Sequence, residues 1–237
     1  MSRQDADMKE LKEKDYYPII ASWLEKKQHC FQTGINTGLN YGRIDVVGVK
    51  DVGGQLSGEI ETISVEVKRE NEPFATASGQ ALGYKVYANR VYLAAVREEG
   101  FSHEEITIAN HLGIGLIQIK AKKPVEILSS PYYKPLTSMH LLLLEKLALG
   151  ECKLCGCFFN IGSLENKYSN LTRTNIKNAL ETEKGLMFWN YSVGTRKKNT
   201  KLWTPDTNDS VYERRFICPD CISFIDKWGN SNSTNEK

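Results

Sequence analysis

The front half of the sequence carries two acidic residues and a lysine inside apolar, β-branched segments. Asp45 lies in GRIDVVGV, and Glu66 and Lys68 lie two residues apart in SVEVK. Because successive side chains of a β-strand alternate between its faces, Glu66 and Lys68 share one face, and a hairpin of the two segments would put Asp45 across from Glu66. Carboxylates suit Mg²⁺ together with a substrate phosphate, and a neighbouring ammonium can orient or deprotonate an attacking water. The trio predicts metal-dependent hydrolysis, and the alternative is a cross-strand ion pair on a solvated face.

The back half carries two Cys-x-x-Cys pairs, CKLC followed by glycine and CPDC followed by the helix-like ISFIDKW. Four thiolates presented in pairs match the tetrahedral coordination of Zn²⁺. A thioredoxin-like dithiol needs only one pair, so it does not explain both; an iron–sulfur cluster or unrelated buried cysteines stay open. The arrangement resembles treble-clef zinc fingers, and a zinc with four protein ligands is structural. The predicted ligands are Cys152, Cys155, Cys218 and Cys221, with Cys157 as an alternative to Cys155.

Hydrophobic periodicity and the positions of glycine and proline define the elements that must position these residues. They predict an α/β protein with a mixed sheet covered by helices on both faces. The expected elements are a helix at 16–27, strands at 29–36, 43–50 and 59–69, a helix at 73–88, a strand at 90–96, a helix at 103–113 and a strand at 114–120.

Prolines and serines punctuate the sequence at 124–135, where we expect a domain boundary. Residues 1–124 are then one domain and 136–229 a smaller zinc-binding domain. The last residues, 230–237, lack apolar side chains and are expected to be disordered.

Gln80 and Tyr84 in GQALGY stand four residues apart, on one face of the helix expected there. With Asp45 and the Glu-x-Lys motif, this order of elements resembles the PD-(D/E)XK nuclease superfamily, the restriction-endonuclease-like fold, over about residues 10–120. The order is α-βββ-α-β-α-β. One departure is Ile44, which stands where the superfamily often has proline before the first acid.

The resemblance implies that Asp45 and Glu66 hold Mg²⁺ and that Lys68 is the catalytic lysine. It gives Gln80 and Tyr84 supporting roles near the active site. Members of the superfamily often add a carboxylate from the first helix, for which Glu13 is preferred here over the other candidates, Asp15 and Glu25.

Charge is divided unevenly along the chain. Residues 1–120 hold 14 Lys and Arg against 17 Asp and Glu, whereas residues 121–237 hold 17 against 12. A basic back half that also contains many aromatic residues predicts a polyanion-facing surface there, and the alternative is a solvated face over an aromatic core. The expected DNA contacts are Arg196, Lys197, Lys198 and Lys201.

Composition supports a globular protein rather than a membrane or fibrous one, with 41% hydrophobic and 25% charged residues and no apolar run near ~20 residues. The polar start has no signal-peptide core, so we expect a cytoplasmic location. The resulting hypothesis is a Mg²⁺-dependent DNA endonuclease acting on duplex or branched DNA, with a structural zinc. Cutting both strands needs two active sites, so a homodimer is plausible. Two alternatives are a catalytically silent DNA-binding protein and a zinc-mediated adaptor between proteins.

Overall fold

The computed structural model describes residues 12–39, 42–53, 59–69, 72–161, 167–168, 174, 178, 186–189 and 214–225. The chain divides into two compact units, one of Met1–Val52 with Ile60–Leu143 and one of Gly53–Glu59 with Leu144–Lys237. Across these described ranges, no helix is long and apolar enough to cross a membrane.

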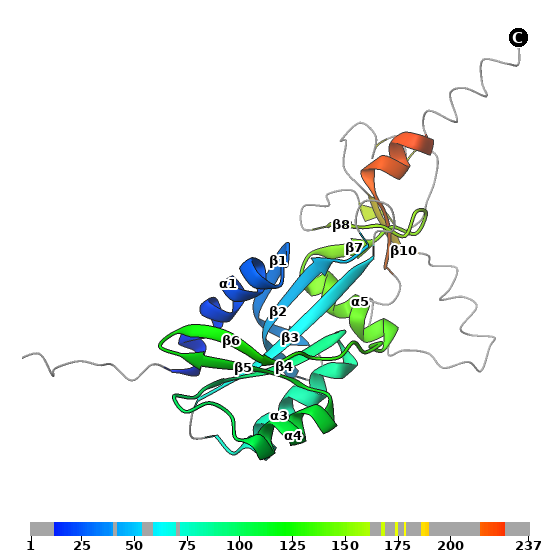
Figure 1. Ribbon diagram of the computed structural model, residues 1–237. Coiled ribbons are helices and arrows are strands. Elements are labelled where there is room, and N and C mark those ends of the chain that lie inside the picture. Colours follow the sequence, from blue (N-terminus) through cyan, green and yellow to red (C-terminus); the bar gives the residue numbers. More distant parts are fainter. Residues whose placement is uncertain are drawn as a thin grey trace, which may run out of the picture. The chain divides into compact units, whose positions relative to one another are not determined.

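A six-stranded mixed sheet forms the centre of the first unit (Figure 1). Its strands lie in chain order, with β3, β4 and β5 parallel to one another and the other neighbouring pairs antiparallel. The strands are β1 (Gln32–Leu39), β2 (Gly42–Asp51), β3 (Ile60–Lys68), β4 (Arg90–Val96), β5 (Gly115–Lys120) and β6 (Lys123–Leu128). The helical elements are η1 (Glu13–Asp15), α1 (Tyr17–Lys27), α3 (Phe74–Gly83), η2 (Tyr84–Val86), α4 (His103–Leu112) and α5 (Thr137–Lys146). The expected mixed α/β architecture is confirmed.

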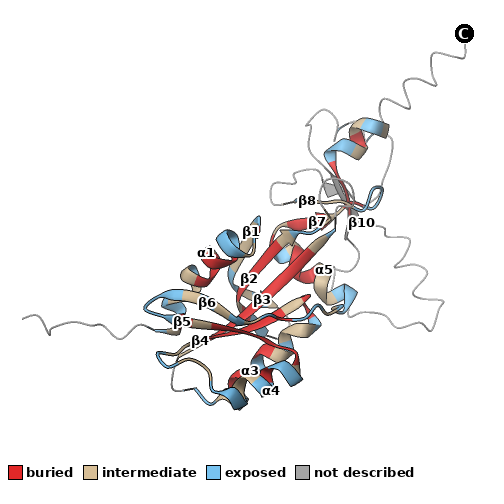
Figure 2. Cartoon of the chain, viewed as in Figure 1, coloured by how far each residue is buried: buried red, intermediate tan, exposed pale blue. Residues whose placement is uncertain are grey.

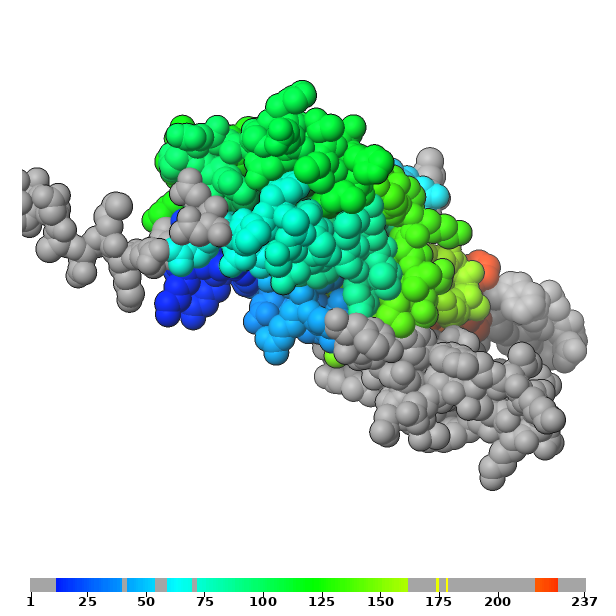
Figure 3. All heavy atoms as spheres, turned by 90° about the horizontal axis from the view of Figure 1, so that it is seen from below, coloured from blue at the N-terminus to red at the C-terminus, as the bar shows by residue number. Residues whose placement is uncertain are grey.

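Helices cover both faces of this sheet, which explains why its central strands are almost wholly apolar. On one face Leu24 of α1 packs with Val65 and Val67 of β3. On the other face α3 and α4 pack against Leu93 and its neighbours on β4 and β5. The central strands are the buried part of the sheet in Figure 2, and α3 and α4 (cyan to green) cover the face seen in Figure 3.

The ends of α4 follow from local sequence. The Ser102 side chain accepts a hydrogen bond from the Glu105 amide, and the Glu105 carboxylate accepts one from the Ser102 amide. Gly113 ends the helix with φ of 65°, a left-handed conformation that glycine adopts without strain. The end expected at Gly113 is confirmed.

The first unit extends beyond residue 124, where its end was expected. Pro124 argues against a strand, but β6 is an edge strand, where proline is tolerated because one side of the strand needs no partner. Further along the chain, the His140 ring Nδ1 lies 3.1 Å from the Tyr87 carbonyl oxygen. The strand expected at 29–36 instead spans Gln32–Leu39, and the helix expected at 73–88 divides into α3 and η2.

The second unit contains short strands and the cysteines. Its strands are β7 (Leu149–Glu151), β8 (Phe158–Asn160), β9 (Lys167–Tyr168), β10 (Leu186–Trp189) and β11 (Arg214–Ile217). A helix at 219–225 begins directly after Cys218, as expected for CPDC. The core of this unit consists of Cys152, Ile217, Cys218 and Ile222, with Cys157, Phe159 and Cys221 packed against it.

Candidate functional site: an acidic cluster and a cysteine cluster

Pairing of β2 with β3 brings Asp45 to Glu66. The antiparallel register pairs Val46 with Val65, so the next residues in each direction are Asp45 and Glu66. The Asp45 Oδ2 accepts a hydrogen bond of 2.9 Å from the Val67 amide, which fixes the carboxylate against β3. The hairpin arrangement expected for these two carboxylates is therefore present.

The Lys68 ammonium forms ion pairs with two carboxylates, those of Glu66 and Glu13. Its Nζ lies 2.7 Å from Glu66 Oε1 and 3.6 Å from Glu13 Oε2. Glu66 is only 4% exposed, because its strand lies between β2 and β4 in the sheet. Glu13, the preferred candidate from the start of the chain, is thus part of the cluster, although it belongs to η1 rather than to α1.

Two tyrosines complete the acidic cluster. The Tyr17 hydroxyl lies 2.7 Å from Asp45 Oδ1 and 3.1 Å from Glu13 Oε1. The Tyr84 hydroxyl contacts Glu66 Oε2 and lies 2.7 Å from the Arg43 carbonyl oxygen. A phenol has one proton to donate, so each tyrosine shares it between two acceptors. Sequence reasoning missed Tyr17; its spacing of four residues from Glu13 was the available signal.

Burial and charge act together on the titration of the cluster. Burial raises the pKa of Glu66, against hydrogen bonds from Lys68 and Tyr84 that lower it. Burial alone would lower the pKa of Lys68, but its hydrogen bond to Glu66 and the nearby carboxylates give a net rise. Burial and the contact with Asp45 raise the pKa of Tyr17, and burial and the contact with Glu66 raise that of Tyr84. Lys68 is therefore an ammonium at neutral pH, and both tyrosines are neutral donors.

Three residues suggested for this site make no hydrogen bond or ion pair to its carboxylates or to Lys68 among the described contacts. Gln80 is exposed on α3 and makes no hydrogen bond to the cluster among the described residues. The Asp15 carboxylate instead accepts a hydrogen bond of 2.7 Å from the Lys12 amide. Glu25 accepts one of 2.9 Å from the Thr33 hydroxyl.

The second unit brings together the four cysteines of the two Cys-x-x-Cys pairs. The sulfur atoms of Cys152, Cys155, Cys218 and Cys221 all lie within 4.8 Å of one another. The turn that presents the first pair is closed by a 2.9 Å hydrogen bond from the Gly156 amide to the Cys152 carbonyl. Glycine suits this position because its φ is 76°.

The donor set fits a metal ion. Four thiolates in pairs are a Zn²⁺ ligand set, and the Cys218 amide points at the Cys152 sulfur over 3.3 Å, as backbone amides do at such sites. Burial raises the pKa of Cys155, but hydrogen bonds from neighbouring cysteines outweigh this and lower it to about 6. A thiolate therefore forms there near neutral pH. The cluster is compatible with zinc.

Cys157 lies beside this cluster as a fifth sulfur. Its Sγ is 3.0 Å from Cys155 Sγ, and its carbonyl accepts a 2.8 Å hydrogen bond from the Cys152 amide. It is not one of the four mutually close sulfurs, which favours Cys155 as the ligand. In the described part of the chain, no group of three or more His, Asp or Glu residues has its possible ligand atoms this close to one another. The expected DNA contacts Arg196, Lys197, Lys198 and Lys201 lie outside the described residues.

Comparisons with known proteins give no function. No known family matches the sequence, and no curated protein matches it. A solved structure of a protein of unknown function from Silicibacter pomeroyi aligns with 59% of this chain and 86% of its own, at 20% identity and a TM-score of 0.44.

Proposed function

We propose that the protein is a Mg²⁺-dependent nuclease that hydrolyses phosphodiester bonds in DNA, built on a restriction-endonuclease-like core. The observation that supports this most is the charge of the acidic cluster. Among the contacts of the described residues, three carboxylates, from Glu13, Asp45 and Glu66, lie together with one ammonium, that of Lys68. Buried and half-buried carboxylates are costly without a compensating charge, so the surplus favours binding of a divalent cation.

Asp45 and Glu66 are the residues that would hold the metal. Both offer oxygen ligands, and each carboxylate has about four acceptor sites, so the hydrogen bonds already made leave capacity for a cation. Mg²⁺ binds proteins through one or two carboxylates plus substrate phosphate and water, so a pair of carboxylates suffices. When bound, the ion would polarise a phosphoryl oxygen and favour attack by water.

The remaining side chains of the cluster have positioning and electrostatic roles in this proposal. Lys68, as an ammonium, would stabilise the negative charge that develops on the phosphoryl oxygens when water attacks phosphorus and the P–O ester bond breaks. Tyr17 and Tyr84 hold the Asp45 and Glu66 carboxylates in orientation, as hydrogen-bonded partners of metal ligands do.

Zinc bound by the cysteine cluster has a structural role in this proposal. All four ligand positions would be filled by protein, which leaves no site for substrate or water. In the described part of the second unit, three of the four cysteines pack with Ile217, Ile222 and Phe159 in one core cluster. A metal would therefore stabilise the fold of this unit.

Incubation with supercoiled plasmid, linear duplex and branched DNA in Mg²⁺ tests the nuclease directly. We expect nicking or cutting of at least one form, its loss in EDTA, and its loss in Glu66→Ala. Binding without cleavage of any form would contradict the nuclease and favour a silent DNA-binding protein. Failure to bind any nucleic acid at low salt would favour a protein-interaction adaptor.

A further inference from the structure

A groove on the first unit lies between α1 and the turn that joins β5 to β6. Its volume is about 520 Å³. Its lining surface is mostly apolar, and the apolar residues in it are Pro18, Ile19 and Trp23 of α1 and Pro124 of β6. The remaining lining residues are Ser22 and four lysines, Lys26, Lys27, Lys122 and Lys123.

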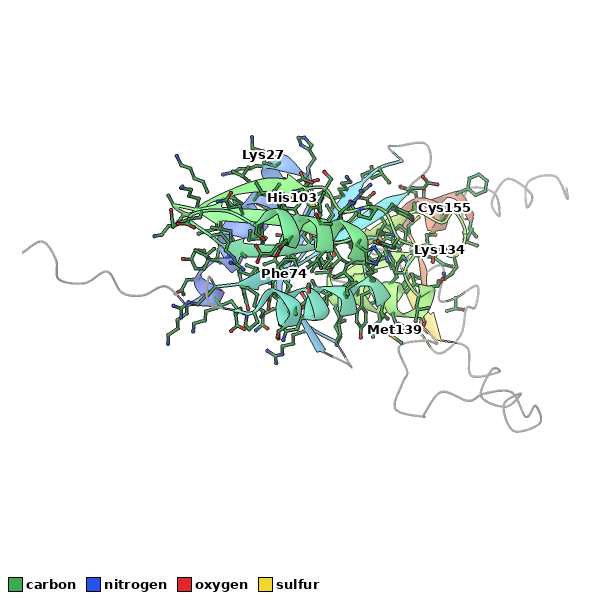
Figure 4. The ribbon with its side chains drawn as sticks, turned by 60° about the horizontal axis from the view of Figure 1, so that its bottom comes forward. Lys27, Phe74, His103, Lys134, Met139 and Cys155 are labelled. Atoms are coloured by element: carbon green, nitrogen blue, oxygen red, sulfur yellow. The ribbon has the colours of Figure 1, made fainter. Side chains whose placement is uncertain are left out.

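The four groove lysines are free to meet a ligand. All four are exposed, and none has a carboxylate partner among the described residues, in contrast to Lys120, whose Nζ is 3.9 Å from Glu98. None of the described residues that line the groove is acidic. Figure 4 shows Lys27 at the surface at the end of α1. An apolar floor with a rim of uncompensated ammonium groups is complementary to a polyanion that also carries apolar groups.

The turn that carries two of these lysines has an unusual backbone. Lys120 pairs with Lys123, which leaves a two-residue loop of Ala121 and Lys122 with φ of 46° and 61°. Such hairpin loops favour Asn-Gly, because both central residues have positive φ. The tight loop places Lys122 and Lys123 next to each other at the rim, opposite α1.

The groove lies at the same edge of the sheet as the acidic cluster. Because β3, β4 and β5 are parallel, their carboxyl ends share one edge; Lys68 ends β3, and the lysine-bearing turn follows β5. Neighbouring strands are ~4.8 Å apart, so β3 and β5 are separated by ~10 Å, a distance that a short stretch of one nucleic-acid strand can span. At its other side the groove begins at Pro18, directly after Tyr17, whose hydroxyl contacts Asp45.

We propose that this groove binds the phosphate backbone of the nucleic-acid strand that enters the acidic cluster. This deepens the proposed function and rests on it for the identity of the polyanion. The lysines contact phosphates, and the apolar floor packs against sugars. Such contacts hold the strand without reading its bases. The first unit would thus bind substrate through this groove, although residues 1–120 carry more acidic than basic side chains.

The test measures how DNA affinity depends on salt in paired variants. Affinity for a labelled duplex is measured across about 50–200 mM salt, with Ca²⁺ in place of Mg²⁺ and the duplex checked for integrity. Each phosphate contact contributes roughly −0.9 to the log–log slope, so Lys26→Ala/Lys27→Ala and Lys122→Ala/Lys123→Ala should each reduce its magnitude by up to about 1.8. The control is Lys134→Ala/Lys146→Ala, which removes two exposed lysines outside the groove and should leave the slope unchanged; Lys134 lies apart from Lys27 in Figure 4.

The outcomes separate this proposal from the nuclease itself. Unchanged slopes in both groove variants, or an equal loss in the control, would overturn the groove assignment even if the parent protein cleaves DNA. Lysine-dependent slopes without any cleavage would support the groove and contradict the nuclease. If polyglutamate binds in a lysine-dependent manner and DNA does not, the groove is a site for an acidic peptide and the proposal is wrong.

Discussion

The Lys68 ammonium lies 2.7 Å from Glu66 Oε1, and both residues come from the same face of one strand. This ion pair is buried on the Glu66 side, since that residue is only 4% exposed. The two residues therefore form one unit whose charges depend on each other. Removing either leaves the other without its closest opposite charge.

We expect Glu66→Ala and Lys68→Ala each to reduce Mg²⁺-dependent cleavage by ~10²-fold or more, because the first removes a metal ligand and the second removes the charge beside the phosphoryl group. Asp45→Ala should behave like Glu66→Ala. Single-turnover cleavage measures the effect, with thermal melting to show that each variant folds. The matched control is Glu98→Ala, which removes an exposed partner of Lys120 and should keep the full rate. Near-parental cleavage by the first two variants would refute the assignment.

Removing one hydroxyl at a time tests the tyrosines. Tyr17→Phe and Tyr84→Phe take away donors to Asp45 and Glu66, and loss of such a partner of a metal ligand costs about 10- to 100-fold in metal affinity or activity. The measurement is the Mg²⁺ concentration that gives half-maximal cleavage, together with the maximal rate. Tyr132→Phe, at a position 58% exposed, is the control. Identical Mg²⁺ profiles for all three variants would show that the hydroxyls do not orient the carboxylates.

The buried His140 should make the stability of the first unit depend on pH. Burial lowers its pKa below the ordinary 6.5, against a hydrogen bond to the Tyr87 carbonyl that raises it. The unfolded chain then binds a proton more readily than the folded chain, so the free energy of unfolding should fall as the pH decreases below 6.5. His140→Asn should reduce this dependence in urea unfolding between about pH 5 and pH 7. The exposed His103→Asn should leave it intact, and equal curves for the parent and His140→Asn would contradict the prediction.

The cysteine cluster should hold one zinc ion per chain, measured by elemental analysis. Cys218→Ser removes a buried ligand and should destabilise the second unit while the first stays folded, because ligand binding and folding are linked. Cys155→Ser should lose zinc and Cys157→Ser should retain it, since Cys155 is one of the four mutually close sulfurs. Iron and sulfide in place of zinc, or a protein without metal, would contradict the assignment.

The basic run in the back half stays a prediction. Replacing Arg196, Lys197, Lys198 and Lys201 by alanine should reduce the salt slope of duplex binding by up to about 3.6 if each contacts a phosphate. Cleavage of DNA that is already bound should change little. An unchanged slope would leave the groove lysines of the first unit as the main phosphate contacts.

The local features of this protein follow from residues that are close together in the chain. The alternation in SVEVK puts Glu66 and Lys68 on one face because side-chain direction in a strand has a period of two. Ser102 and Gly113 define α4 because capping depends on residues within one helical turn. The two Cys-x-x-Cys pairs identified the four cysteines that meet in space, because ligand spacing within each pair is local.

Contacts between distant segments depend instead on how the whole chain packs. Tyr17 contacts Asp45 across 28 positions of the chain, and Tyr84 contacts Glu66 across 18. Hydrophobic periodicity describes only neighbouring residues, so it predicts neither contact. The strand β6 was missed because Pro124 is unfavourable in a strand interior and acceptable only at a sheet edge, which is a property of the assembled sheet. The groove lysines come from α1 and from the β5–β6 turn, about 100 residues apart in the chain. The net charge of residues 1–120 is negative, so it did not indicate a basic surface in this part of the protein. Net charge sums over all faces of a fold, whereas a ligand meets only the face that the packing of the sheet and helices creates.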